Sequence, residues 1–90
     1  MKKIVKRDYV VGDDPVSMTP GQMLAVLRNL QGFTQNELAK KTKMTQANIS
    51  SLESGRQQIG RERAVVLAKA LRVHPAVIMF PNYRVLDQAA

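Results

Sequence analysis

The pattern that most constrains the fold is a helix-opening signal that recurs along the middle of the chain. Thr19, Thr34 and Thr45 each precede a run of residues whose apolar side chains recur at helical spacing. A threonine at this position caps a helix, because its hydroxyl accepts a hydrogen bond from a backbone N–H of the first turn. Gln22 and Glu37 stand three residues after the first two threonines and complete capping boxes. The repetition predicts three consecutive helices.

Further signals extend the helical pattern. Gly32 and Gly55 suit the left-handed residue that ends a helix, and we expect them to close the first and third helices. A fourth helix is predicted over about 61–71, and a short fifth begins at His74-Pro75 and ends at Phe80-Pro81. We predict an all-α fold of five helices. The expected core is made of apolar residues on the inward helix faces: Met23, Leu24, Leu27, Leu30, Leu38, Ala39, Ile49, Leu52, Ala64, Leu67, Ala68, Leu71, Val77, Ile78 and Met79.

Two segments flank the helical region. Residues 1–12 are basic and rich in β-branched side chains, and a Gly-Asp-Asp-Pro sequence then breaks the chain. We expect residues 1–17 to be a β-prone arm and linker, residues 18–81 to be the helical domain, and residues 82–90 to be a tail. A lone strand is not stable by itself, so an ordered arm would pair with a second copy or with another protein. The alternative is a frayed basic tail.

The charge balance limits the partners. The 90 residues include 14 Lys and Arg against 7 Asp and Glu, which gives a net charge of +7. Such a chain favours a polyanionic partner, nucleic acid first and an anionic membrane surface second. No apolar run approaches the roughly 18–20 residues of a membrane span, and no sustained apolar stretch marks a secretory signal. We therefore expect a cytoplasmic protein with one small core.

The sequence offers no constellation for catalysis or metal binding. It has no cysteine and a single histidine, His74, so disulfides and a zinc site are excluded. His74 is expected to cap a helix. Asp13 and Asp14 are adjacent in the linker and suit a turn rather than a pair of catalytic carboxylates. With neither a nucleophile–base set nor a Gly-rich phosphate loop, we predict no enzymatic activity and no cofactor.

The stretch from Phe33 to Gly55, FTQNELAKKTKMTQANISSLESG, carries the functional prediction. Two short helices joined by a three-residue turn match a helix-turn-helix, and the small Ala39 permits their close packing. With Ile49 and Leu52 facing inward, the outward positions of the second helix carry only small or neutral hydrogen-bonding side chains: Gln46, Ala47, Ser50 and Ser51. A helix face selected for solubility alone would carry more Glu and Lys. The pattern therefore predicts a helix that reads DNA in the major groove.

These residues resemble the phage-repressor/Cro-type helix-turn-helix family. The segment TQNELAKKTKMTQANISSLESGR follows the family pattern TQ-x-x-LA…S/T-x-x-x-I-S-x-x-E-x-G, and the resemblance extends over about residues 20–79. It implies a lambda-repressor-like domain. One departure is Lys43, since the family usually has glycine in this turn, and a left-handed conformation there would cost about 1 kcal/mol.

The resemblance also implies roles for individual residues. It makes Gln46, Ala47 and Ser51 the base readers, and it places three residues at the edge between base and backbone: Thr45, Asn48 and Ser50. Contacts to DNA phosphate are expected from Gln35, Lys43, Arg56 and Arg61. Arg28 and Glu53 are expected to form a structural ion pair. The remaining cations of the fourth helix and its end, Arg63, Lys69 and Arg72, are expected to be solvated.

Three functions compete. The leading one is a sequence-specific regulator of transcription, a repressor that binds double-stranded DNA as a homodimer on a near-palindromic operator, since one recognition helix covers only a few base pairs. We expect the dimer contact from the fifth helix with the tail, and secondarily from the arm. The alternative is an antitoxin that binds a toxin protein through residues 1–12 and regulates its own operon. The third is a non-specific nucleoid or RNA-binding protein, which the net charge favours and the scarcity of aromatic residues disfavours.

Overall fold

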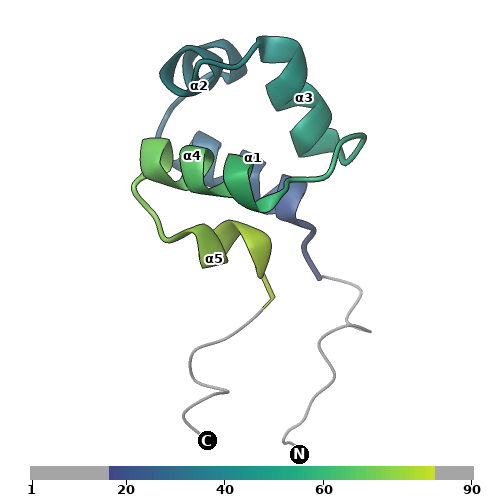
Figure 1. Cartoon of the computed structure of the whole chain (residues 1–90). Helices are drawn as coiled ribbons and strands as arrows, with labels where there is room; N and C mark the ends of the chain where they lie inside the picture. The colour runs from purple at the N-terminus through teal and green to yellow at the C-terminus, as the bar shows by residue number, and fades with distance from the viewer. Residues whose placement is uncertain (1–16, 83–90) are drawn as a thin grey trace, which may run out of the picture.

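The computed structural model describes residues 17–82, and these form helices around one core (Figure 1). The helices are α1 (Pro20–Leu30), α2 (Gln35–Thr42), α3 (Gln46–Ser54), α4 (Arg61–Leu71) and α5 (Pro75–Met79). No strand occurs within the described residues, so the predicted all-α fold of five helices is confirmed. The arm predicted over residues 1–12 and most of the predicted tail lie outside the described residues.

Hydrogen bonds of the first turns explain where the helices begin. The Thr19 hydroxyl accepts from the backbone N–H of Gln22 at 3.1 Å, and the side chain of Gln22 accepts from the N–H of Thr19 at 2.9 Å. Thr34 forms the same reciprocal pair with the residue three positions on. At α3 the hydroxyl of Thr45 accepts from the N–H of Asn48 at 3.1 Å. All three predicted threonine caps are confirmed.

The core is made by the inward faces of all five helices. Its buried apolar members are Leu24, Leu38, Ala39, Ile49, Leu52, Ala64, Leu67, Ala68, Leu71 and Ile78. Two predicted core residues are wrong, because Leu30 is 76% exposed and Val77 is 38% exposed. Leu30 is the last residue of α1, and its side chain extends the apolar face of α1 beyond the core into solvent. In the short α5, consecutive residues point in different directions, so that Ile78 is buried and Met79 is half-buried.

α5 and the α2–α3 pair lie at opposite ends of the domain (Figure 1). α5 packs on α1 and α4, while α3 packs on α1 and α2. The side chain of Asn82 joins the two ends of the described chain: its Oδ1 accepts from the backbone N–H of Met18, and its Nδ2 donates to the carbonyl of Met18, both at 2.9 Å. The two ends of the described chain, Met18 and Asn82, therefore lie together beside α5.

Within residues 17–82, two residues other than glycine adopt the left-handed conformation. Lys43 ends α2 and Arg72 ends α4, each with a φ of 60°. The left-handed turn considered for Lys43 is thus present, whereas the one at Arg72 has no counterpart in the sequence prediction. A side chain in this conformation costs about 1–2 kcal/mol, because its Cβ approaches the following carbonyl oxygen. Lys43 nonetheless holds the turn that joins α2 to α3.

Candidate nucleic-acid interface

The α2–α3 pair is held by close packing and by a fixed turn. Ala39 is 2% exposed and faces the buried side chains of Ile49 and Leu52 across the shared core. The N–H of Met44 donates to the carbonyl of Ala39 at 2.9 Å, which closes the end of α2. The buried hydroxyl of Thr42 donates to the carbonyl four residues earlier at 2.8 Å. Because Ala39 is small, α2 and α3 can pack closely. The hydrogen bonds of the turn then fix α3 relative to α2.

The outer face of α3 carries neutral side chains that are open to solvent. Thr45, Gln46 and Ala47 are exposed at its start, and Asn48, Ser50 and Ser51 are half-buried along it. Thr45 also donates its hydroxyl to the Oδ1 of Asn48 at 3.0 Å, so these two side chains are partly committed to the cap. In residues 17–82, the side chain of Gln46 has no protein hydrogen-bond partner. Among the predicted base readers, Gln46 therefore has the most hydrogen-bonding capacity available.

The start of α2 has free backbone donors. Thr34 caps the N–H of Glu37 and accepts the first intrahelical bond through its carbonyl. In the described chain this leaves the N–H groups of Gln35 and Asn36 without an acceptor. Free N–H groups at a helix N-terminus, together with the helix dipole, suit a phosphate group.

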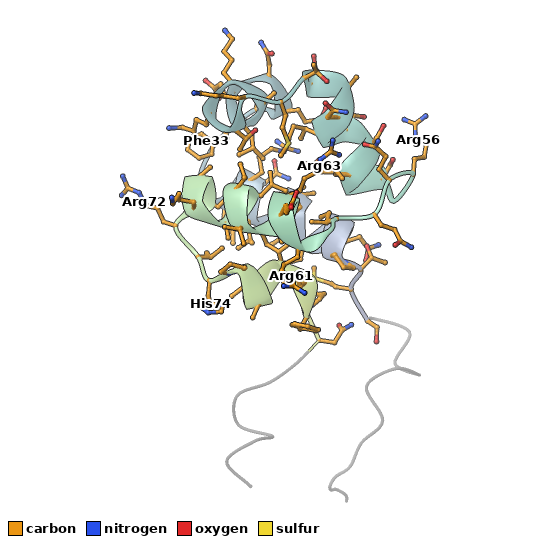
Figure 2. The ribbon with its side chains drawn as sticks, viewed as in Figure 1. Phe33, Arg56, Arg61, Arg63, Arg72 and His74 are labelled. Atoms are coloured by element: carbon orange, nitrogen blue, oxygen red, sulfur yellow. The ribbon has the colours of Figure 1, made fainter. Side chains whose placement is uncertain are left out.

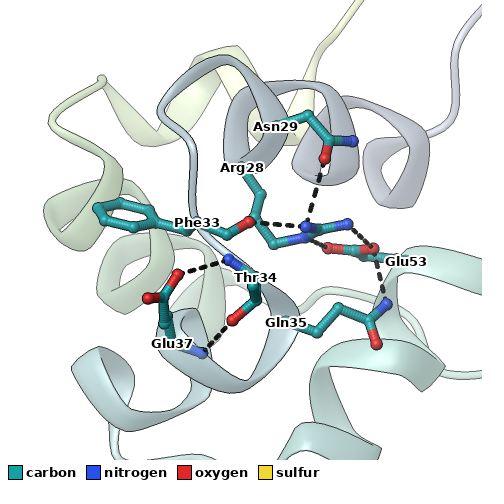
Figure 3. Close-up of polar contacts among 7 residues, drawn as sticks. All are labelled: Arg28, Asn29, Phe33, Thr34, Gln35, Glu37 and Glu53. Carbon is teal, nitrogen blue, oxygen red and sulfur yellow. Dashed lines mark hydrogen bonds and ion pairs between the residues drawn. The ribbon is translucent and has the colours of Figure 1, made fainter.

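The side chain of Gln35, a predicted phosphate contact, also makes a hydrogen bond within the domain. Its Nε2 donates to the Oε1 of Glu53 at 3.0 Å, so the amide nitrogen faces α3 (Figure 3). The partner lies 18 residues further along the chain, which is why sequence spacing did not reveal it.

The ion pair expected between Arg28 and Glu53 is present at the junction of α1, α2 and α3 (Figure 3). The Nε of Arg28 donates to the Oε2 of Glu53 at 2.6 Å, and its Nη2 donates to Oε1 at 3.1 Å. Its Nη1 donates to the carbonyl of Phe33 at 2.8 Å. The hydrogen bond with Glu53 raises the pKa of Arg28, and the side chains of the pair are only 13% and 9% exposed. The pair is part of the scaffold that holds α3.

The cations around this surface do not all face the same way. Arg56 is exposed beyond the end of α3 and donates from Nε to the hydroxyl of Ser54 at 3.3 Å. Figure 2 shows Arg61 on the α5 side of α4 and Arg63 on the side of α2 and α3. Arg63 also donates to the Oε1 of Gln57 in the α3–α4 loop at 3.4 Å. The spacing of two residues on one helix accounts for the opposite directions. Arg63, predicted to be merely solvated, is therefore better placed than Arg61 to flank α3.

The fold and this surface define a helix-turn-helix DNA-binding domain. A scaffold of α1, α4 and α5 supports two closely packed helices, and the second of these presents a polar face. The model of the helix-turn-helix family of the Cro/C1 type matches residues 24–78, more than half of the chain. The chain belongs to this family, and it is a DNA-binding regulator of transcription.

Solved structures agree with this assignment. The restriction-modification controller protein C.AhdI from Aeromonas hydrophila is 27% identical, with a TM-score of 0.64 over 67% of this chain and 91% of that one. The clp gene regulator ClgR from C. glutamicum is 25% identical, with a TM-score of 0.65 over 79% of this chain and 88% of that one. The P22 c2 repressor, solved with a synthetic operator, shares the fold at 22% identity, with a TM-score of 0.66 over 70% and 96% of the two chains. No protein of curated function matches the chain significantly.

No helix in residues 17–82 is long and apolar enough to cross a membrane. No group of three or more His, Cys, Asp or Glu side chains in that range could hold a metal ion.

Proposed function

We propose that this regulator is a sequence-specific repressor that binds a near-palindromic operator on double-stranded DNA as a homodimer. The observation that carries the proposal is the exposed, neutral outer face of α3, which α2 and the Arg28–Glu53 pair hold in place. Gln46, Ala47 and Ser51 are the proposed base readers. Similarity to a controller protein and to a gene regulator supports the regulatory role. The proposal assigns the protein to the cytoplasm and gives it no enzymatic activity.

Phosphate contacts would surround the reading helix. The free N–H groups at the start of α2 supply one, and exposed or half-buried cations supply the others. The proposed cations are Lys43 in the turn, Arg56 after α3, and Arg61 and Arg63 on α4. These contacts would fix the register of α3 on the duplex, while the side chains of α3 select the sequence.

A dimer contact through α5 is supported by exposed apolar side chains. Phe80 is 60% exposed and Val77 is 38% exposed, and both belong to the end of the domain away from α3. Burying these side chains between two copies removes apolar surface from water. Two recognition helices one helical turn of DNA apart would then read two half-sites.

The proposed function is tested by competition between an operator recovered from a random library and random duplex DNA. We expect the operator to bind at least about 1,000-fold more tightly at physiological salt, as specific regulators do. Affinities within a few-fold of each other would instead support the non-specific nucleoid protein that the net charge allows.

A second candidate function is an antitoxin that binds a toxin protein and regulates its own operon. It is favoured by the basic, β-branched residues 1–12 and by the position of Met18, which is hydrogen-bonded to Asn82 just beyond α5. A partner bound to the preceding segment would therefore start beside α5. Deleting residues 1–12 should then abolish toxin binding and leave DNA binding intact. Unchanged toxin binding, or failure of the full chain to bind a toxin encoded beside it, would remove this candidate.

Replacing Gln46 by alanine should weaken binding to the cognate operator by about 1–3 kcal/mol and relax the base preference at one position. The exposed amide of Gln46 can make two hydrogen bonds to the edge of one base, and alanine can make none. The measurement is a binding titration on the operator and on its single-base variants. Equal losses on cognate and random DNA would remove Gln46 from the base readers.

Replacing Arg56 by alanine should weaken binding to every sequence alike. An exposed cation beyond the end of α3 is placed for a phosphate, and the loss of one phosphate contact lowers the salt slope by about one. Titrations on operator and random DNA at several salt concentrations measure this slope. A change in sequence preference with an unaltered slope would contradict the assignment.

Replacing Lys43 by glycine and Arg72 by glycine should each raise the free energy of unfolding by about 1 kcal/mol, because glycine adopts the left-handed conformation without the steric cost of a side chain. Only Lys43→Gly should also weaken DNA binding, since Lys43 lies in the turn before α3. Chemical denaturation and DNA titrations of the matched pair test both parts. Equal DNA affinity of the two variants would show that Lys43 contacts no phosphate.

A further inference from the structure

We propose that Asn48 is a base-reading residue that presents hydrogen-bond donors to the DNA, and that Thr45 is the positioning residue that sets this polarity. The inference rests on the proposed sequence-specific binding and deepens it, because it names the kind of base edge that one side chain of α3 selects. That edge carries an acceptor: the N7 of a purine, the O6 of guanine or the O4 of thymine.

The cap of α3 differs from the caps of α1 and α2. In those two helices the third residue is Gln22 or Glu37, and its side-chain oxygen accepts from the backbone N–H of the capping threonine at 2.9 and 2.8 Å. Asn48 holds the same position in α3, but its side chain is one methylene group shorter. Its Oδ1 instead accepts from the hydroxyl of Thr45 at 3.0 Å. The amide of Asn48 is therefore held by a group that donates to its oxygen.

A second bond of the same cap determines how the hydroxyl of Thr45 is used. Its Oγ1 accepts from the backbone N–H of Asn48 at 3.1 Å, which leaves its proton for the Oδ1 of the same residue. The reversed amide would bring Nδ2 to the hydroxyl, which would then accept twice and leave its proton without an acceptor in the cap. Thr45 therefore favours the orientation in which the amide oxygen of Asn48 faces the cap.

The nitrogen of the Asn48 amide is left for the DNA. Nδ2 carries two N–H groups, and neither has an acceptor within residues 17–82, whereas the remaining lone pair of Oδ1 lies beside the cap. Asn48 is half-buried on the first turn of α3, and the N-terminal residues of a recognition helix are those that contact base edges. An amide that offers donors fits an acceptor edge, and it is mismatched with the amino group of cytosine.

Asn48→Asp tests the polarity of this contact. One carboxylate oxygen can still accept from the hydroxyl of Thr45, but the donors that faced the DNA are replaced by an acceptor. We expect the cognate operator to bind at least about 10-fold more weakly, and the preference at one position to change to cytosine, whose amino group a carboxylate accepts from. Titrations on the operator and on all its single-base variants measure this change. The added negative charge weakens all of these duplexes alike, so it does not alter the preference.

Thr45→Asp tests the positioning role. Aspartate caps a helix as well as threonine does, so the denaturation midpoint should stay close to that of the unaltered chain. It has no proton to donate, so the amide of Asn48 should turn its nitrogen to the carboxylate and its oxygen to the DNA. The same position of the operator should then lose its preference for an acceptor edge. Thr45→Ser is the matched control, because it keeps the hydroxyl and should keep the preference.

Three results would overturn the inference. One is an unchanged base preference in Asn48→Asp, and another is an equal loss on operator and random DNA for Asn48→Ala, which is the mark of a phosphate contact. The third is a preference that Thr45→Asp and Thr45→Ser retain or lose alike, which would show that the hydroxyl of Thr45 does not orient the amide. All three presuppose that the unaltered chain prefers its operator. If it binds operator and random duplex alike, the proposed function itself fails, and this inference fails with it.

Discussion

Replacing Gly21 by alanine should lower the free energy of unfolding by about 3 kcal/mol. Gly21 is buried in the first turn of α1, directly against the C-terminal turn of α3. An added Cβ would lie 2.3 Å from the carbonyl oxygen of Leu52 and 2.8 Å from that of Glu53. Both obstacles are backbone atoms, which cannot swing aside as a flexible side chain can. The two helices would have to separate, and overpacking of this kind costs about 1–3 kcal/mol or more.

Urea denaturation followed by circular dichroism measures this loss. Gly60→Ala is the control, since a Cβ at Gly60 meets nothing within 4 Å, and its loss should stay below about 1 kcal/mol. Because α3 must move to accommodate the methyl group added at Gly21, cognate DNA binding should also fall more than random binding. A stability within about 1 kcal/mol of the unaltered chain would show that α1 and α3 can separate freely, contrary to the packing described above.

Replacing Glu53 by alanine should also cost about 3 kcal/mol of stability. It leaves the guanidinium of Arg28, whose side chain is 13% exposed, without its charged partner, and it removes the acceptor of Gln35. Breaking a buried ion pair from one side costs about 3–5 kcal/mol, and the residual exposure of this pair favours the lower end of that range. The bond from Arg28 to the carbonyl of Phe33 is expected to survive.

A double-mutant cycle measures the coupling free energy between Arg28 and Glu53 apart from their other contacts. Arg28→Met should destabilise the fold because it leaves the carboxylate of Glu53 with one of its three hydrogen bonds. The double variant Arg28→Met with Glu53→Ala should be more stable than the sum of the two losses predicts. A coupling of at least about 1 kcal/mol is expected for residues in direct contact. Additive losses would show that the two side chains stabilise the domain independently.

Local signals were sufficient to predict most of the fold. Each threonine cap depends on a hydrogen bond that spans three residues, so its pattern is visible in the sequence. The burial of Leu38, Ile49 and Leu52 follows from helical periodicity within single elements. The Arg28–Glu53 pair was expected only from the family resemblance, because its partners come from different helices.

Features that depend on how helices cross were not predicted. In the sequence, Gly21 only follows the proline that begins a helix, and nothing there shows why glycine is required. The requirement arises in the fold, where the backbone of α3 packs directly against Gly21. Leu30 fits the apolar stripe of α1 but extends past the helices that would cover it. The contact of Gln35 with Glu53 and the opposite directions of Arg61 and Arg63 likewise depend on tertiary placement. The outward residues of α3 could therefore be predicted from the sequence, whereas the tertiary contacts that hold α3 in place could not.

The central claim is that α3 reads DNA sequence as one of two symmetry-related copies. Selection of bound duplexes from a random library by the full chain tests it most directly. We predict an enriched motif of two inverted half-sites whose centres lie about 10 base pairs apart, and we expect its enrichment to be lost with Gln46→Ala. Recovery of no common motif, or of a motif that Gln46→Ala selects equally well, would contradict the claim.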